Sequence, residues 1–244
     1  PIIEFDRVSF AYDRSTPVIK EVSFSIQDAR AVCIIGPNGT GKTTLCQLML
    51  GLRYPQSGHI HLLGMRPEQA RLQAGYVPQA TSIDPLFPAT VLDIVLMGNL
   101  APGAKGGYTR SERGYACEIL ESCGLAEQRN QPFAQLSGGM KQRTLIARAL
   151  VCQPKILIMD EPLTSIDPAA EAALLEIFNR LQEKMVVVMV SHQFEFVSPY
   201  VEQVICMHNN QQVHVHPTES VSQENLSTLY GSKFKRVAHE TDLN

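Results

Sequence analysis

The chain has 244 residues with a formal net charge of −3; 44% of the residues are hydrophobic and 18% are charged. This is the composition of a globular protein with one large domain, or with a core and a subdomain, and the lack of a basic excess argues against a nucleic-acid partner. The longest uninterrupted apolar run, at 185–190, is far shorter than the ~20 residues that a membrane-spanning helix needs, and the first residues lack the pattern of a signal peptide.

The first third of the chain is predicted to consist mainly of strands. Residues 2–10 and 18–27 alternate apolar and polar side chains, as half-buried strands do. A buried apolar strand is predicted at 31–35, and shorter strands are predicted at 59–63 and 74–77. The sequence therefore predicts five strands before the middle section.

The middle section, residues 80–150, has helix signals and no strand pattern. Thr90 with Asp93, and Thr109 with Glu112, have the spacing of capping boxes, each followed by apolar residues at helical intervals. This section therefore predicts a helical insertion within an α/β core.

The second half of the chain returns to strands. Continuous apolar runs at 156–159 and 185–190 are of the kind that parallel sheets bury on both faces. Between them, Asp167 can cap a helix that has proline at its first position. Residues 204–207 and 212–216 predict a hairpin that turns at two asparagines, which tolerate the backbone of such a turn.

Residues 36–43 match the phosphate-binding loop pattern. Glycines at 36, 39 and 41 permit a backbone in which N–H groups converge on phosphate oxygens, and the helix predicted from Lys42 adds partial positive charge at its start. Lys42 would reach the β- and γ-phosphates, and the Thr43 hydroxyl would coordinate Mg²⁺. An ordinary glycine-rich turn is the alternative, but the strand before the loop and the helix after it favour a bound nucleoside triphosphate.

The apolar run at 156–159 leads into two carboxylates, Asp160 and Glu161. Asp160 can bind Mg²⁺ through water, and Glu161 can accept a proton from an attacking water. Upstream, the segment 137–139 places a serine and two glycines at a helix start, which makes a second anion site. One γ-phosphate does not need both sites on one chain. A head-to-tail pair of chains would use them, with the Ser137 site of each chain closing over the ATP of the other.

In this order, the motifs resemble the ATP-binding cassette (ABC) ATPases over nearly the whole chain. Residues 36–43 match the Walker A loop, 137–139 the signature, and 156–160 Walker B, with Glu161 as the catalytic glutamate. Met140 stands where the family usually has glutamine, a change that we expect to leave the anion site in place.

The resemblance implies an α/β P-loop NTPase fold with an antiparallel β subdomain and an inserted α-helical subdomain. On this reading, residues 1–244 form a single ABC ATPase domain. The expected divisions are a core with the β subdomain at 1–79 and 151–230, a helical subdomain at 80–150 and a flexible tail at 231–244.

The resemblance also implies roles for residues that indicate little alone. Gln79 matches the Q-loop, 165–167 the D-loop, His192 the switch histidine, and Tyr12 the aromatic that stacks on adenine. Taken singly, Gln79 and His192 are more often surface or core residues, and Tyr12 is explained by strand packing; their order around two strong motifs favours function.

The implied ATP-binding residues are Tyr12, Gly36, Pro37, Asn38, Gly39, Thr40, Gly41, Lys42, Thr43, Thr44, Ser137, Gly138, Gly139 and Asp167. The implied Mg²⁺ ligands are Thr43, Gln79 and Asp160, and the implied catalytic residues are Lys42, Gln79, Glu161 and His192.

A membrane-transporter ATPase is the leading functional hypothesis. Soluble ABC proteins of DNA repair, chromosome organisation or translation carry coiled-coil insertions, zinc modules or two cassettes, and a P-loop GTPase would need an Asn-Lys-x-Asp motif; none of these is present. A separate ATPase chain resembles bacterial importers. This implies a head-to-tail homodimer, integral membrane permease subunits, an extracytoplasmic solute-binding protein as an indirect partner, and a place on the cytoplasmic face of the membrane.

For the substrate, residues 76–79 and 83–98 resemble importers of manganese, zinc or iron. Importers of siderophores, cobalamin or another small solute are the alternatives. Two histidine pairs, at 59 and 61 and at 214 and 216, have a spacing that places both imidazoles on one strand face, where they could share a metal. We expect exposed strand faces instead, because no third ligand is near in sequence.

Overall fold

The computed structural model describes residues 1–13, 16–79, 88–99, 107–164, 166–192, 194, 198–209 and 212–221. Several predictions fall at least partly outside these ranges. They concern the substrate-related segment at 83–87, Ser165 of the D-loop, Asn210 of the hairpin turn and the tail at 231–244.

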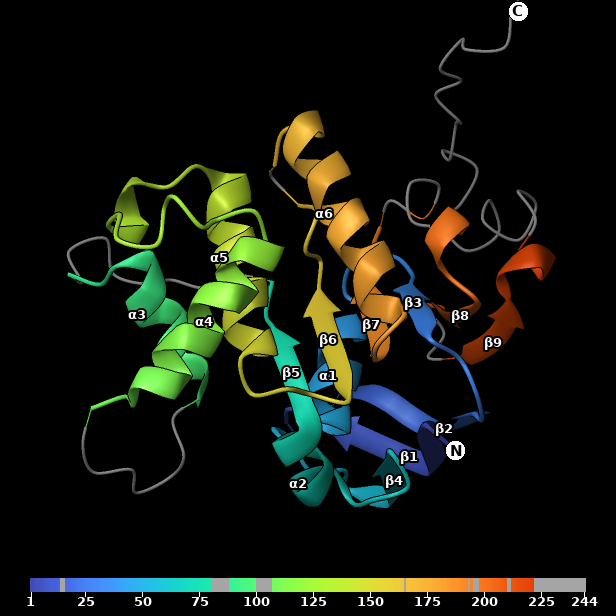
Figure 1. Ribbon diagram of the computed structural model, residues 1–244. Helices are drawn as coiled ribbons and strands as arrows, with labels where there is room; N and C mark the ends of the chain where they lie inside the picture. The colour runs from blue at the N-terminus through green and yellow to red at the C-terminus, as the bar shows by residue number, and fades with distance from the viewer. Residues whose placement is uncertain are drawn as a thin grey trace, which may run out of the picture.

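The described strands form two sheets (Figure 1). A three-stranded antiparallel sheet has the order β2-β1-β4, built from β1 (Ile3–Ala11), β2 (Pro17–Ile26) and β4 (Ser57–Leu62). A six-stranded sheet has the order β5-β6-β7-β3-β8-β9. Its strands are β3 (Ala31–Ile35), β5 (Ala74–Val77), β6 (Ile156–Asp160), β7 (Val186–Val190), β8 (Gln203–Met207) and β9 (Val213–Pro217). All its pairings are parallel except that of β8 with β9, which is the predicted terminal hairpin.

The described α-helices are α1 (Lys42–Met49), α2 (Pro67–Ala70), α3 (Val91–Leu96), α4 (Arg110–Ser122), α5 (Gly138–Leu150) and α6 (Pro168–Gln182). Short 3₁₀ segments lie at Arg71–Gln73, Met97–Asn99, Phe133–Gln135, Ser198–Tyr200 and Thr218–Ser220. Helices α3, α4 and α5 gather on the β5 side of the six-stranded sheet (Figure 1).

Helices α3 and α4 begin as the sequence predicts. Thr90 and Asp93 form a complete capping box at the start of α3, and Thr109 and Glu112 form another at the start of α4. Each box satisfies donors that a helix start otherwise leaves without partners. The elements that the structure describes within residues 80–150 are helical, as the sequence pattern indicates.

Strands β3, β6, β7 and β8 of the six-stranded sheet are buried on both faces, which explains their continuous apolar runs. One set of alternating side chains, which includes Val32, Ile34, Ile158 and Val188, packs with α1 and the three-stranded sheet. The opposite set, with Cys33 and its neighbours Leu157, Met159 and Met189, packs with α3 to α6. The α/β core with its antiparallel β subdomain is thus held by two apolar clusters, one on each side of the sheet.

Strands β1 and β2 place the first site residue at their end. Phe5 of β1 is paired with Phe24 of β2, and their rings stack 4.7 Å apart at 12°. Register shifts follow along β1 at Val8 and Phe10. Strand β1 ends at Ala11, so Tyr12 lies just beyond the C-terminal end of this central strand.

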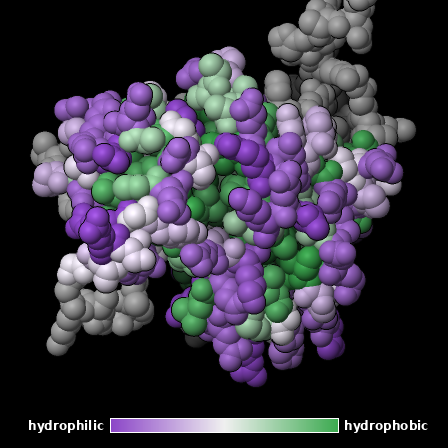
Figure 2. All heavy atoms as spheres, viewed as in Figure 1, coloured by the Kyte–Doolittle hydropathy of each residue, from purple (hydrophilic) through white to green (hydrophobic). Residues whose placement is uncertain are grey.

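The visible face in Figure 2 is mainly hydrophilic, with apolar side chains showing in smaller patches between the polar ones. Within the described ranges, no helix combines the length and the apolar character needed to cross a membrane.

Candidate functional site

The predicted phosphate loop connects β3 to α1. Its glycines adopt positive φ angles, +153° at Gly36, +84° at Gly39 and +95° at Gly41. A Cβ at Gly36 would collide with the carbonyl oxygen of Met207, and one at Gly41 would lie 2.8 Å from Val18 Cγ1. The strand β8 and the segment of Val18 therefore require glycine at both ends of the loop.

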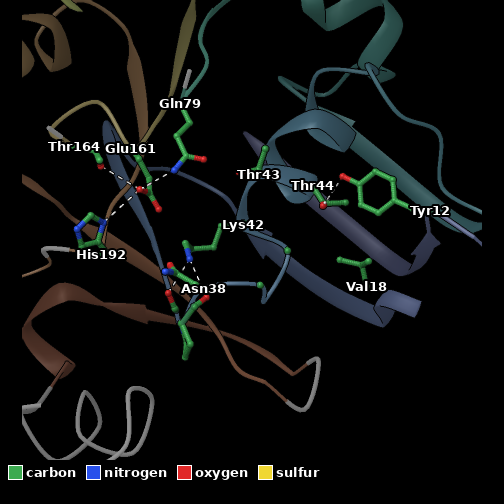
Figure 3. Close-up of a pocket in the computed structure, with 14 residues that line it drawn as sticks. Tyr12, Val18, Asn38, Lys42, Thr43, Thr44, Gln79, Glu161, Thr164 and His192 are labelled. Carbon is green, nitrogen blue, oxygen red and sulfur yellow. Dashed lines mark hydrogen bonds and ion pairs between the residues drawn. The ribbon is translucent and has the colours of Figure 1, made fainter. Parts of the chain in front are cut away.

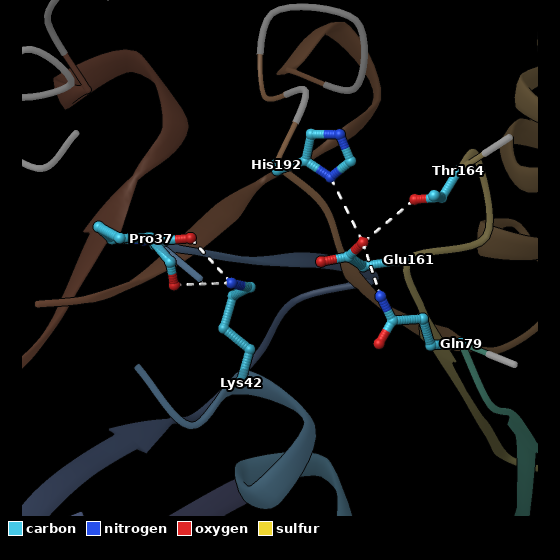
Figure 4. Close-up of polar contacts among 7 residues, drawn as sticks. Pro37, Lys42, Gln79, Glu161, Thr164 and His192 are labelled. Atoms are coloured by element: carbon cyan, nitrogen blue, oxygen red, sulfur yellow. Dashed lines mark hydrogen bonds and ion pairs between the residues drawn. The ribbon is translucent and has the colours of Figure 1, made fainter. Parts of the chain in front are cut away.

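Lys42 is folded back over this loop. Its ammonium donates to the carbonyl of Gly36 at 2.8 Å and to that of Pro37 at 2.9 Å, and the side chain is buried (Figure 4). Burial lowers the pKa of Lys42, and the nearby Glu161 and Asp160 carboxylates oppose that shift. Two of the three ammonium donors are thus used by the loop itself.

Asp160 ends β6 and is only 1% exposed. Burial raises the pKa of its carboxyl; the neighbouring Thr43 hydroxyl and Lys42 ammonium favour the ionised form. Neither carboxylate oxygen has a well-formed hydrogen bond to any part of the chain that the structure describes. A buried carboxylate without partners is costly unless a cation or water completes it.

Glu161 follows directly and receives contacts from several elements on one oxygen. Its Oε2 accepts hydrogen bonds from Gln79 Nε2 and from Thr164 Oγ1, each at 3.1 Å, and lies 3.4 Å from His192 Nδ1 (Figures 3 and 4). Glu161 also has a φ of +49°, in a region that non-glycine residues rarely occupy. Such backbone strain is found preferentially at functional sites.

Tyr12 lies on the opposite side of the loop from Glu161 (Figure 3). Its hydroxyl is 3.0 Å from Thr44 Oγ1, and its ring meets that of Phe10 edge-on at 5.1 Å. The tyrosine is 57% exposed, so a large part of it is available to a ligand.

These groups surround an open cavity of about 960 Å³. Its lining is Tyr12, Val18, Gly36, Pro37, Asn38, Gly39, Gly41, Lys42, Thr43, Thr44, Gln79, Glu161, Thr164 and His192. Most of the residues predicted from the sequence thus meet at one place. Asp160 is buried and is not among the lining residues. The predicted Thr40 lines a neighbouring cavity of about 200 Å³, with its hydroxyl donating to Pro37 O at 2.9 Å.

Val18 and Thr164 also line the cavity and were not predicted from the sequence. Val18 lies in β2, far along the chain from the loop motif, and no local pattern indicates it. Thr164 could have been suspected from its position three residues after Glu161, which is the spacing of a tight turn. In that turn the N–H of Thr164 donates to Glu161 O at 3.2 Å, and the Thr164 hydroxyl bonds the Glu161 carboxylate.

The segment 137–139 and Asp167 lie away from this cavity. Ser137 caps α5 by accepting from Met140 N at 3.3 Å, and Asp167 caps α6 by accepting from Ala170 N at 3.0 Å. Ser137 and Gly138 are exposed, whereas Gly139 is buried where a Cβ would collide with Ala170 Cβ. On this chain they are helix starts and not part of the pocket.

The pocket fits a nucleoside triphosphate with Mg²⁺. Three loop glycines without side chains, a lysine ammonium and a helix start line the same space. The carboxylate of Asp160, which is near the Thr43 hydroxyl and has no well-formed hydrogen bond in the described part of the chain, supplies the hard oxygen ligands that Mg²⁺ prefers.

The two histidine pairs do not join this pocket. His61 contacts Glu4 at 3.3 Å, and His214 lies between His208 and His216, with ring centroids 5.4 and 6.2 Å away. Burial and the two neighbouring imidazoles lower the pKa of His208. In the described part of the chain, no group of at least three His, Cys, Asp or Glu side chains could hold a metal ion.

Comparison with known proteins matches the ABC transporter family over residues 19–164. The probable metal transport system ATP-binding protein of Chlamydia pneumoniae is 39% identical over 207 residues, 82% of this chain and 83% of that protein. The manganese transport system ATP-binding protein MntB of Bacillus subtilis is 36% identical to this chain, and the match covers 95% of this chain and 93% of MntB.

Among solved structures, an inward-facing ABC transporter ascribed to the metal-chelate type has a TM-score of 0.80 and 28% identity, covering 93% of this chain and 88% of that one. The architecture, the pocket and these similarities agree. The chain belongs to the ABC transporter family and is an ATP-binding subunit that hydrolyses ATP.

Proposed function

We propose that this chain powers the import of a divalent transition metal, manganese, zinc or iron, through separate permease subunits. The observation that carries the proposal is the similarity to MntB, which extends over 95% of this chain. An ATPase subunit of a transporter requires a membrane permease as its partner. We place the chain on the cytoplasmic face of the membrane, where ATP is available, with an extracytoplasmic solute-binding protein as an indirect partner.

For the nucleotide, we propose that residues 36–44 hold the triphosphate and that Tyr12 stacks on the adenine. Lys42 would neutralise phosphate charge once a ligand draws it from the carbonyls of Gly36 and Pro37. Thr43, Asp160 and Gln79 are the proposed Mg²⁺ ligands; when bound, the ion would neutralise charge on the β- and γ-phosphates.

For hydrolysis, we propose that Glu161 accepts the proton of the attacking water and that His192 orients that water and the γ-phosphate. We propose that Gln79 links this site to the helical subdomain; its position after β5 and its 3.1 Å bond to Glu161 support this role. We propose that a second copy binds in a head-to-tail dimer and that its ATP is contacted by Ser137, Gly138, Gly139 and Asp167. Their absence from the lining of this chain's own pocket supports this proposal.

A deletion strain tests the proposed substrate. Under chelation, cells without this chain should contain less manganese, zinc or iron than wild-type cells, and excess metal should restore the content. Complementation by the wild-type chain should restore it too, whereas Glu161→Gln should not. Mass spectrometry of cellular metals is the measurement. Unchanged contents of all three metals would remove the substrate while leaving the ATPase in place.

A metal-chelate importer is the second candidate, because the solved transporter with a TM-score of 0.80 is ascribed to that type. The same strains separate the two functions. A defect in the uptake of a chelated metal, with normal uptake of the free ion, would favour the second candidate.

A further inference from the structure

Tyr12 is held by α1 and by the turn that follows this helix. Its hydroxyl lies 3.0 Å from Thr44 Oγ1 and donates a longer bond of 3.5 Å to Gln47 Oε1. The guanidinium carbon of Arg53 lies over the ring, 5.2 Å from its centroid. An exposed aromatic side chain would otherwise sample several rotamers, so these contacts limit the planes that the ring can adopt.

The backbone of the turn after α1 places Arg53 at this ring. Gly51 has a φ of +63° and ends the helix, after which the chain reverses. The carbonyl oxygen of Gln47 then accepts from Leu52 N at 2.9 Å and from Arg53 N at 3.3 Å. The helix that begins at the phosphate loop therefore also determines, at its other end, where the guanidinium lies.

Arg53 acts from outside the nucleotide pocket. Tyr12 is among the described residues that line the cavity of about 960 Å³, and Arg53 is not. Tyr12 is thus the residue that contacts both the guanidinium and the cavity. Aromatic faces carry negative charge, and a cation over one face attracts that charge. A base stacked on the other face would then be repelled less strongly by the π-electrons of the ring.

We propose that Arg53 is a positioning residue for nucleotide binding: it fixes the plane of the Tyr12 ring and polarises it, and so raises the affinity for the base without touching the triphosphate. The inference rests on the proposed stacking of adenine on Tyr12. Thr44 and Gln47 hold the hydroxyl end of the ring, and Arg53 holds its face.

Dissociation constants of the full chain for MgATP and for magnesium tripolyphosphate test this, since tripolyphosphate has neither base nor ribose. Arg53→Ala should raise the Kd for MgATP about threefold to fivefold, which is the size expected of one exposed cation–π contact. The Kd for magnesium tripolyphosphate should stay unchanged. Arg53→Lys keeps a cation and should recover part of the affinity. Arg66→Ala removes an exposed guanidinium elsewhere on the same half of the chain and should change neither constant.

A double substitution identifies the route of the effect. In a Tyr12→Ala background, Arg53→Ala should cause no further loss of MgATP affinity. An equal loss for both ligands, or no loss for MgATP, would overturn the role of Arg53. If Tyr12→Ala itself leaves MgATP binding intact, the stacking role of Tyr12 is wrong and the inference fails with it. If only Tyr12→Ala weakens binding, the stacking role stands and Arg53 alone is excluded. Thermal unfolding of each variant establishes that it is folded.

Discussion

At the scale of single residues, one carboxylate oxygen is the meeting point of the site. Glu161 Oε2 has Gln79, Thr164 and His192 within 3.1 to 3.4 Å. A carboxylate oxygen offers about two lone pairs, so it cannot serve all three contacts and also accept a proton from water. The three contacts hold Oε2 in place, so we expect the other carboxylate oxygen, Oε1, to accept the proton from water.

Thr164 provides a test of this arrangement. Its hydroxyl donates to Glu161 Oε2 at 3.1 Å, and both residues belong to the same turn. Thr164→Val keeps the shape of the side chain but removes the donor. We expect kcat for ATP hydrolysis to fall roughly tenfold to a hundredfold or slightly more, which corresponds to the loss of a hydrogen bond of about 1.5–3 kcal/mol to a charged group. The Kd for MgATP should change little, since the hydroxyl orients the base and does not hold phosphate.

Thr164→Ser is the matched control for this experiment. It retains the hydroxyl at an exposed position, and its turnover should stay close to that of the wild type. Equal losses in the valine and serine variants would show that the methyl group matters and not the donor, and would contradict the positioning role.

The local motifs of the site could be predicted from the sequence, and the contacts between them could not. Residues 36–43 form a contiguous pattern whose backbone requirements are visible in their glycines. The contact between Gln79 and Glu161 spans 82 positions and depends on β5 pairing with β6. Thr164 and Arg53 have no pattern of their own, because each acts through a partner that only the folded chain brings near.

At the scale of elements, the starts of α5 and α6 pack with almost no space between them. Gly139 is the second residue of α5, and a Cβ there would overlap that of Ala170, in the first turn of α6. The sequence suggested an anion site at this glycine. The structure adds a packing reason for the same residue, which is independent of any ligand.

Gly139→Ala should therefore destabilise the chain without nucleotide. We expect the free energy of unfolding to fall by about 1–3 kcal/mol, as is usual when a group is forced into a filled contact. Chemical denaturation followed by circular dichroism measures this. In an Ala170→Gly background the same substitution should cost much less, because the colliding methyl group is gone.

Gly114→Ala is the control for the general effect of alanine in a helix. Gly114 lies inside α4, and a Cβ there would meet nothing within 4 Å. This variant should gain about 0.5–1 kcal/mol, because alanine is the better helix former. A loss at Gly139 that persists in the Ala170→Gly background would contradict the packing explanation.

Element boundaries followed the sequence most closely where a side chain marks them. Thr90, Thr109 and Asp167 each cap the predicted helix. The strand predicted from residue 59 instead begins at Ser57, because Ser57 pairs with Ser9 across an irregularity in β1. Such pairing depends on the neighbouring strand, so alternation within one segment does not reveal it.

At the scale of the whole molecule, the chain has two separated groups suited to phosphate. The pocket holds the loop, Lys42 and Glu161, whereas Ser137 and Gly138 are exposed at the start of α5 and take no part in its lining. An exposed helix start with a serine and glycines suits an anion that comes from outside the chain. The proposed head-to-tail dimer would bring each such start over the ATP of the other copy.

Glu161→Gln should reveal that dimer. The amide keeps the shape of the side chain but cannot accept a proton, so hydrolysis should fall about a hundredfold or more while MgATP still binds. Trapped ATP would then hold two chains together, and size-exclusion chromatography in MgATP should show a dimer that is absent without nucleotide. Adding Ser137→Arg should abolish the dimer by placing bulk where the partner's γ-phosphate must lie, with each chain's own ATP affinity unchanged. A monomer in MgATP, with hydrolysis intact in Glu161→Gln, would contradict both the base and the dimer. A dimer that survives Ser137→Arg would instead mean that the two chains meet through another surface.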